Sequence, residues 1–300
     1  MRRMLVIGGT GFIGFHVVKE AKKRGFDTHS ISLHSPKKKR LIKGVKYIKV
    51  DVTKIEDLKR KIKKSYNYVV NAGGYGLHPD FGKKGDILIK SHFLGLINIL
   101  ETLKKKNLKK FVQIGSSTEY GKINSPIKET AYGSPQTPYA VAKLSCTNYL
   151  LHLYQTQKLP VVILRLFQVY GSNQTGDKIL PFLIENCKKN KKFLTTVGKQ
   201  YCDFCHIDDV VNAIFKSLIK GKTSGEIFNI GSGKKIQIKN LIKLVKKLIG
   251  KGKPIFGGLK YKKGTNMRNF PNINKAKSKL NWKPKISLIE GLKKTISSFS

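Results

Sequence analysis

The sequence predicts an α/β fold of the Rossmann type, a doubly wound parallel sheet with a smaller C-terminal α/β lobe. Three observations lead to this prediction. A short apolar run at residues 4–7 leads directly into a glycine-rich turn and then into a helical pattern. Apolar strands and helices alternate through the first 170 residues, as in a parallel sheet. The alternation then loosens, so we divide the chain into domains 1–170 and 171–300, with the chain crossing between them.

Composition excludes several classes of protein. The chain has 300 residues and an apolar fraction of 40%, enough for a core, and no apolar run long enough to cross a bilayer. Its formal charge of +43 could indicate nucleic-acid binding, but lysine carries nearly all of it, whereas phosphate and guanine recognition favours arginine. We therefore interpret the lysines as a solvated surface that attracts anionic substrates. Four scattered cysteines do not form a disulfide framework, so we expect a cytoplasmic protein.

The turn at residues 8–14 contains a Gly-x-Gly-x-x-Gly pattern between a strand and a helix. Its glycines allow the backbone to approach a pyrophosphate, which the unpaired amides of the helix N-terminus then bind. The first domain is therefore predicted to bind a dinucleotide. The turn residues assigned to this site are Gly8, Thr10, Gly11, Phe12, Ile13 and Gly14.

A second strand is expected at residues 28–33, with Ser32 near its end. NAD-binding proteins usually carry a carboxylate there for the ribose hydroxyls, and a nearby arginine accommodates the extra phosphate of NADP. Ser32 has no acid beside it, and residues 37–40 are all basic. This pattern favours NADP over NAD. NAD stays open, because lysine is frequent throughout the chain.

The next elements supply further cofactor contacts. Strands are expected at 45–50 and 67–71, separated by a helix at 55–63. Residues at the ends of these strands would lie against the adenine and the rest of the cofactor. They are Asp51, Val52, Asn71, Ala72 and Gly73.

A strand at 111–114 is followed by a turn rich in small hydroxyl residues that begins near Ser116. Open α/β sheets place their chemistry at the carboxyl ends of such strands. Ordinary loop serines are the alternative interpretation of this turn.

A helix is expected to begin after Thr137, whose hydroxyl can cap it, with Pro138 in the first helical position. Tyr139 and Lys143 are four residues apart and so lie on one face of its first turns. An ammonium beside a phenol favours the phenolate and suits general acid–base catalysis. Such pairs are common on helices, so the pair alone does not establish chemistry.

Two predicted helices, 87–103 and 139–154, are apolar on most faces and therefore buried on both sides. This pattern predicts a homodimer in which both helices form the interface. In the second half we expect one more central strand, several helices and two short strands. The central strand is expected at 161–166 and the two short strands at 193–197 and 227–230. The helices are expected at 180–189, 208–219, 241–249 and 288–297.

Together these motifs resemble the extended short-chain dehydrogenase/reductases, specifically the NAD-dependent epimerase/dehydratase family that acts on nucleotide sugars. The resemblance runs in the family's order from residue 5 to about residue 292. Its motifs are the turn at 8–14, Ser116 four residues before Tyr120-Gly121, Tyr139-x-x-x-Lys143, residues 164–167 with Tyr170-Gly171, residues 203–210, residues 228–233 and Trp282-Lys283-Pro284.

The resemblance implies a mechanism. Tyr139 would exchange a proton with a sugar hydroxyl or ketone, and Ser116 would hydrogen-bond the reacting oxygen. Lys143 would support Tyr139 and, with it, contact the nicotinamide ribose. Residues 171–300 would bind the nucleotide diphosphate.

Several positions depart from the family's pattern. Ser117 and Thr118 occupy the positions where 4,6-dehydratases carry Asp-Glu, so we do not expect dehydratase activity. His92 and Gln168 replace asparagines found in many members, the second of them on the substrate side. Cys202 replaces the arginine that usually contacts the nucleotide phosphates.

Another basic residue would then have to bind the phosphates, and Lys262, Lys263 or Arg268 could do so. Cys202 also forms a Cys-x-x-Cys pair with Cys205, a weak metal or redox signal without a second pair, and we predict no metal. The candidate substrate-binding residues are Ser117, Thr118, Gln168, Cys202 and Arg268.

These residues support three hypotheses. The first is an NADP-linked reductase of a nucleotide-bound 4-keto sugar, favoured by the missing dehydratase acids and the acid-free second strand. The second is a nucleotide-sugar 4-epimerase with the same three catalytic residues and a tightly retained NAD. The third, motivated only by the charge, is a non-catalytic protein that binds nucleic acid or has a regulatory role.

Overall fold

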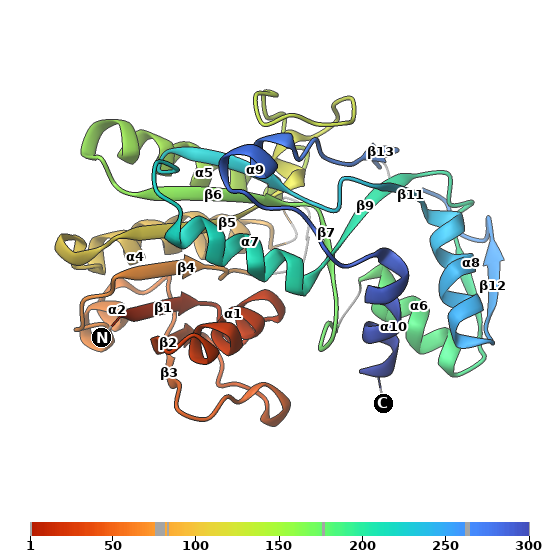
Figure 1. Ribbon diagram of the computed structural model, residues 1–300, viewed down its shortest axis with the longest axis horizontal. Helices are drawn as coiled ribbons and strands as arrows, with labels where there is room; N and C mark the ends of the chain where they lie inside the picture. The colour runs from red at the N-terminus through yellow and green to blue at the C-terminus, as the bar shows by residue number, and fades with distance from the viewer. Residues whose placement is uncertain (1, 76–81, 83, 176–177, 262–264, 300) are drawn as a thin grey trace.

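The molecule is built on a seven-stranded sheet in which all neighbouring strands run parallel (Figure 1). The computed structural model describes residues 2–75, 82, 84–175, 178–261 and 265–299. The predicted Rossmann-type fold is confirmed. In spatial order the strands are β10 (Glu226–Ile230), β6 (Val161–Leu166), β5 (Lys110–Ser116), β4 (Tyr68–Asn71), β1 (Arg3–Ile7), β2 (Asp27–Ser32) and β3 (Lys46–Lys49).

Helices cover both faces of this sheet and form two separate cores. One core joins the sheet to α1 (Phe12–Lys23) and α7 (Ile207–Ile219), with Trp282 fully buried in it. The other joins it to α2 (Ile55–Lys61), α4 (Gly95–Thr102) and α5 (Pro138–Gln157). The central strands β1, β4, β5 and β6 are buried almost throughout, which explains their mostly apolar sequences.

The helix expected at 87–103 is present, but it is not a regular α-helix throughout. It consists of α3 (Asp86–Ile89), a π-helical turn (Lys90–Leu94) and α4. Such turns are often found at functional sites. Ile87 and Leu94 are 37% and 40% exposed there, and the homodimer stays a prediction. Short 3₁₀ turns lie at Lys38–Arg40, Lys105–Asn107 and Ser117–Tyr120.

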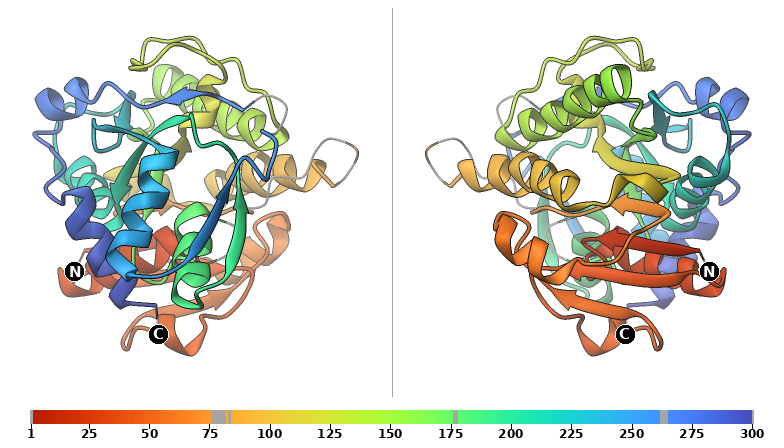
Figure 2. Two further views of the ribbon diagram at one scale, coloured as in Figure 1. Left: turned by 90° about the vertical axis from the view of Figure 1, so that its right-hand side faces the viewer. Right: turned by 90° about the vertical axis from the view of Figure 1, so that its left-hand side faces the viewer.

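A second lobe lies beside the carboxyl ends of the strands, at the right of Figure 1 and towards the viewer in the left view of Figure 2. Its core contains Leu183, Leu241 and Leu292, one from each of three helices. These helices are α6 (Ile179–Lys188), α8 (Ile238–Ile249) and α10 (Leu288–Ser297), and a parallel pair of strands, β8 (Lys192–Thr195) and β12 (Lys253–Phe256), lies beside them.

A small sheet that was not predicted from the sequence joins the lobe to the main domain. Its central strand β9 (Tyr201–His206) pairs with three short strands. They are β7 (Gln168–Tyr170), β11 (Lys235–Gln237) and β13 (Arg268–Asn269). The helix α9 (Asn274–Lys279) was also not predicted.

The chain returns to the main sheet after residue 170. Both α7 and β10 come from the segment assigned to the second lobe, yet α7 packs on α1 and β10 pairs with β6. The division into 1–170 and 171–300 therefore stays a prediction about function and does not describe two separate bodies. Among the residues described, no helix combines the length and apolarity needed to span a bilayer.

Candidate active site

The glycine turn after β1 brings three pieces of backbone together at the carboxyl edge of the sheet. Gly8 has φ +75, and a Cβ there would lie 2.6 Å from the Cα of Gly73 in the turn after β4. A Cβ on Gly14, in the first turn of α1, would lie 2.1 Å from the carbonyl oxygen of Gly8. Only glycine permits both approaches, and they place the amino end of α1 where a pyrophosphate would bind.

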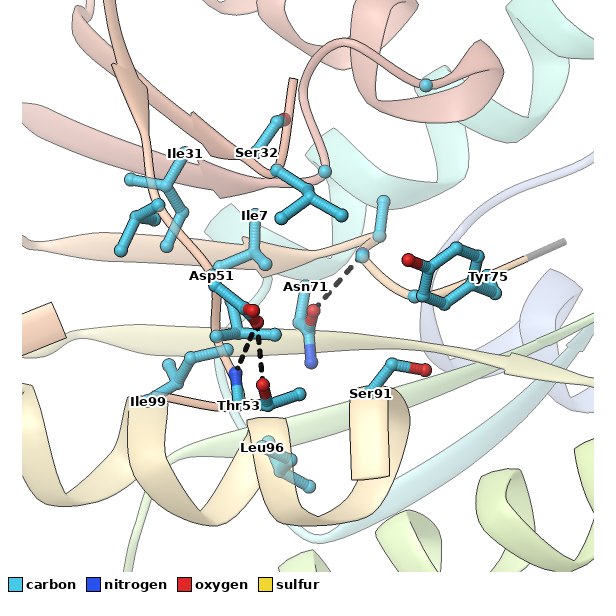
Figure 3. A pocket seen from close by; sticks show the side chains of 18 of the residues that line it. Ile7, Ile31, Ser32, Asp51, Thr53, Asn71, Tyr75, Ser91, Leu96 and Ile99 are labelled. Carbon is cyan, nitrogen blue, oxygen red and sulfur yellow. Dashed lines mark hydrogen bonds between the residues drawn. The ribbon is translucent and has the colours of Figure 1, made fainter. Parts of the chain in front are cut away.

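A cavity of about 410 Å³ opens beside this turn (Figure 3). Its walls are the ends of β1, β2 and β4 and the side chains of Leu96 and Ile99 on α4. The narrow glycine backbone and apolar floor fit the adenosine half of a dinucleotide. Of the predicted cofactor residues, the lining includes Gly8, Thr10, Gly11, Ser32, Asp51, Val52, Asn71, Ala72 and Gly73, but not Phe12, Ile13, Gly14, Tyr139 or Lys143.

Local hydrogen bonds fix the polar residues of the cavity. Asp51 accepts hydrogen bonds from the amide and the hydroxyl of Thr53, at 3.0 and 2.7 Å. Asn71 accepts from the amide of Gly73 at 3.2 Å and donates to Gln113 at 2.9 Å. Several lining residues come from loops and from the irregular helix and were not predicted from the sequence, among them His34, Thr53, Tyr75, Lys90 and Ser91.

The end of β2 carries no carboxylate, as the sequence indicated. The Ser32 hydroxyl accepts a hydrogen bond from the amide of Thr10 at 3.3 Å. Arg40, from the basic segment, donates to the carbonyls of Thr10 and Asn173, at 2.9 and 2.6 Å. Arg40 thus ties this loop to the glycine turn. The residues between Ser32 and Arg40 that could receive a phosphate include the exposed lysines 37–39.

Helix α5 begins as predicted. Thr137 accepts a hydrogen bond from the amide of Ala140 at 3.2 Å, and Pro138 follows as the first helical residue. Lys143 is 4% exposed and donates from Nζ to the carbonyl of Ile114 in β5, at 2.8 Å. The same Nζ lies 5.8 Å from the centroid of the Tyr139 ring. The strand that ends at Ser116 therefore holds the ammonium beside the phenol.

The ring of His92 packs against the ring of Tyr139, a contact that the sequence did not reveal. The π-helical turn directs its ring edge-on to Tyr139, with the centroids 5.3 Å apart. Its Nε2 is 3.1 Å from the carbonyl oxygen of Tyr75. A Cβ on Gly74 would lie within 1.9 Å of this ring, so His92 links the cofactor cavity to the Tyr139 side of the site.

The predicted substrate residues occupy different environments. Thr118 is exposed and donates from its hydroxyl to the Ser116 oxygen at 2.9 Å. Ser117 is 5% exposed and accepts from the Asn269 amide group at 3.3 Å, so its hydroxyl joins the turn after β5 to β13. Gln168 is exposed on β7.

Cys202 and Arg268 lie on neighbouring strands. Arg268 pairs with Tyr201, whereas Cys202 pairs with Asn269, so Arg268 and Cys202 are directed to opposite faces of the small sheet. Because β13 lies at the edge of this sheet, Arg268 would have to reach around that edge to meet a phosphate beside Cys202. Lys262 and Lys263 lie outside the described residues.

The Cys-x-x-Cys pattern does not form a metal site. Cys202 and Cys205 are three residues apart on one strand, so their side chains point to opposite faces. Burial raises the pKa of the Cys202 thiol to about 11, which disfavours the thiolate. Within the described ranges, no group of three or more His, Cys, Asp or Glu side chains could hold a metal ion.

The buried carboxyl of Asp203, next to Cys202, should make stability depend on pH. Burial raises its pKa from 3.8 to about 6, although it accepts hydrogen bonds from Ser232 and Lys234. Its contribution is therefore present below pH 3.8 and lost as the pH rises through about 6. The loss is about 3 kcal/mol, at roughly 1.4 kcal/mol for each pKa unit.

Chemical unfolding of the wild type and of Asp203→Asn between about pH 4.5 and pH 7 measures this effect. The wild type should lose stability relative to the variant as the pH rises. A difference in unfolding free energy that is the same at both ends of this range would contradict the assignment.

The seven-stranded parallel sheet and the glycine turn at its carboxyl edge define a dinucleotide-binding protein of the Rossmann type. The chain belongs to the NAD dependent epimerase/dehydratase family, whose model matches residues 4–231. It is thus an extended short-chain dehydrogenase/reductase of the family that acts on nucleotide sugars, and its cofactor is a nicotinamide dinucleotide.

Individual relatives are similar over nearly their whole length. The chain is 31% identical to a UDP-glucuronate 4-epimerase from Thermodesulfobacterium geofontis, over 98% of this chain and 94% of that one. Its fold superposes with a TM-score of 0.90 on the UDP-glucose 4-epimerase of Thermotoga maritima, solved with UDP-glucose, at 28% identity over 99% and 98% of the two chains. A UDP-glucuronic acid 4-epimerase from Bacillus cereus, solved with a fluorinated substrate analogue and NAD, gives a TM-score of 0.90 at 26% identity, over 99% and 98%.

Proposed function

We propose that the protein is a nucleotide-sugar 4-epimerase whose Ser116, Tyr139 and Lys143 act on the sugar C4 hydroxyl. The observation that carries this proposal is the position of Lys143, whose Nζ binds the Ile114 carbonyl and lies 5.8 Å from the Tyr139 ring. This contact joins the strand ending at Ser116 to the helix bearing the phenol. Relatives named as 4-epimerases, similar over nearly the full length, favour this reaction over others in the family.

Each residue has a defined task in this proposal. Tyr139 takes the proton of the 4-hydroxyl through its phenol oxygen and later returns it. Ser116 donates a hydrogen bond to the same sugar oxygen while negative charge develops there. Lys143, fixed by its hydrogen bond to the Ile114 carbonyl, lies beside the Tyr139 ring and contacts the nicotinamide ribose. The bound nicotinamide ring supplies the hydride acceptor and donor.

The second lobe would hold the nucleotide diphosphate, and the nucleotides named for the relatives favour UDP. Arg268 on β13 and Lys235 on β11 are exposed cations of the small sheet. Both lie against the Phe270 ring, at 5.8 and 5.5 Å from its centroid. Two cations on one aromatic surface suit a diphosphate, and binding energy from this remote group would orient the sugar.

A second candidate is the NADP-linked reduction of a 4-keto nucleotide sugar. The observation that favours it is the end of β2, where Ser32 replaces the usual carboxylate and lysines 37–39 are exposed. The same catalytic residues would then deliver a proton to the ketone oxygen. Thr118, in the place of the dehydratase acid, disfavours 4,6-dehydration in either case.

The dinucleotide bound to the protein as isolated distinguishes the two candidates. Denatured protein should release about one NAD per chain, and incubation with UDP-glucose, UDP-galactose or UDP-glucuronate, without added cofactor, should yield the 4-epimer. Release of no dinucleotide, with NADPH oxidation by a 4-keto-6-deoxy nucleotide sugar, would replace the epimerase by the reductase. Failure of both reactions would overturn the proposed function.

A further inference from the structure

A fully buried carboxylate lies directly behind the catalytic serine. Glu119 belongs to the 3₁₀ turn that follows β5 and is 0% exposed. Its Oε1 accepts a hydrogen bond from the amide of Ser116 at 2.7 Å. Its Oε2 accepts from the hydroxyl of Thr147 on α5, at 2.8 Å, and from Nε of Arg165 on β6, at 2.7 Å. The carboxylate thus connects the serine turn, the helix of Tyr139 and a central strand.

The surrounding structure is shaped around this carboxylate. A Cβ on Gly115 would lie 2.6 Å from Glu119 Oε1, so glycine is needed at that position in β5. Arg165 is 3% exposed and stacks on the Tyr120 ring at 4.3 Å, and Tyr120 in turn donates to Asn229 at 2.7 Å. Burying an ion pair seldom improves stability over a well-packed apolar pair. A role in holding the turn explains its presence better than a role in stability alone.

The hydrogen bonds of the turn also orient the Ser116 hydroxyl. The serine oxygen accepts from the amide of Thr118 at 3.2 Å and from the Thr118 hydroxyl at 2.9 Å. A hydroxyl oxygen has two lone pairs, and both are used here. The Ser116 proton must then point away from the turn. The capping box formed by Ser116 and Glu119 keeps this arrangement fixed.

We propose that Glu119 is a positioning residue, which anchors the Ser116 amide through its Arg165-paired carboxylate so that the serine hydroxyl acts as a hydrogen-bond donor to the reacting sugar oxygen. Thr118 completes the orientation by occupying the serine lone pairs. This inference rests on the proposed function, because the sugar oxygen is the acceptor that it names. Preorganised donors of this kind are effective because they need not reorient during the reaction.

A double-mutant cycle tests whether Glu119 acts through Ser116. Ser116→Ala should lower kcat about a hundredfold to a thousandfold, as the loss of one such donor does elsewhere. Glu119→Gln should lower kcat about thirtyfold and change KM less than about threefold, because a positioning fault acts in the transition state. When Ser116 is already alanine, adding Glu119→Gln should lower kcat by less than about a further threefold. An equal cost in both backgrounds would overturn the proposal.

Asp209→Asn is the matched control, because Asp209 is also a buried carboxyl, 5% exposed, that accepts two backbone hydrogen bonds, from Lys285 and Ile286. It should change kcat less than about threefold in either background.

If Glu119→Gln does not fold, Thr118→Val replaces it in the double-mutant cycle, because Thr118 is exposed and its substitution should leave the fold intact. Introduced alone, Thr118→Val should lower kcat about tenfold. Introduced into Ser116→Ala, it should leave kcat unchanged. An equal effect with and without that hydroxyl would overturn the proposal.

Amide hydrogen exchange gives a readout that does not depend on the substrate. The Ser116 amide should be protected in the wild type and should exchange at least about tenfold faster in Glu119→Gln, with the Asp209→Asn variant unchanged there. If the wild type proves inactive on every nucleotide sugar, the proposed function fails while this measurement still tests the anchoring of Ser116. Unchanged exchange at Ser116 in Glu119→Gln would overturn the inference even in an active enzyme.

Discussion

Replacing Tyr139 with phenylalanine is expected to lower kcat about a thousandfold, because the variant lacks the only group proposed to exchange a proton with the sugar. Phenylalanine keeps the ring that packs edge-on to His92 at 5.3 Å and lies 5.8 Å from Lys143 Nζ. The fold and the cofactor cavity should therefore be unchanged. The measurement is the turnover of whichever nucleotide sugar the wild type accepts, together with the dinucleotide content of both proteins.

Tyr149→Phe is the matched control for this substitution. Tyr149 lies on the same helix and packs edge-on to Phe93, with ring centroids 5.9 Å apart, but it is not part of the proposed site. It should keep kcat within about threefold of the wild type. Tyr139→Phe with more than about a tenth of the wild-type kcat would show that another group moves the proton.

The sequence predicted the parts of this structure that local physics determines. The turn at Gly8 and Gly14 was predictable because only glycine allows two backbone segments to approach so closely. The start of α5 followed from Thr137 and Pro138, whose capping chemistry involves only neighbouring residues. The apolar central strands β1, β4, β5 and β6 were equally clear because they are buried almost throughout.

What the sequence did not reveal depends on contacts between distant segments. The strands β7, β9, β11 and β13 are two to six residues long, and they become strands by pairing with partners from elsewhere in the chain. No local apolar pattern indicates such strands. The π-helical turn at Lys90–Leu94 was missed for a different reason, since a single extra residue in a helix does not disturb the apolar pattern enough to be seen.

In the candidate site, too, the sequence indicated residues that lie in local motifs and did not indicate a residue whose contacts are distant in the chain. Ser116 lies in one motif, and Tyr139 and Lys143 share another, so the sequence alone indicates all three. Their catalytic roles stay a proposal. Glu119 was not singled out, because a glutamate in a turn is usually solvated. The role proposed for it depends on a distant residue, Arg165, which is 46 positions later in the sequence and donates to its carboxylate at 2.7 Å.

Substituting Gly14 with alanine is expected to weaken dinucleotide binding about a hundredfold, equivalent to roughly 3 kcal/mol. The new Cβ would lie 2.1 Å from the Gly8 carbonyl oxygen and 2.8 Å from the Cα of Gly9. These are backbone atoms and cannot rotate aside, so α1 must move away from the glycine turn. That movement withdraws the free amides that should hold the pyrophosphate.

Calorimetric titration of the dinucleotide-free protein with NAD and NADP measures the loss, and two other glycines calibrate it. Gly221→Ala meets nothing within 4 Å, so it should bind as the wild type does. Gly11→Ala brings a Cβ only to 3.2 Å from the Gly8 oxygen, and its effect should lie between the other two. Because Gly14 and Gly221 lie outside the cavity lining and gain the same methyl group, the difference between these two variants reports the backbone clash at Gly14. Wild-type affinity in Gly14→Ala would show that the pyrophosphate does not bind at the amino end of α1.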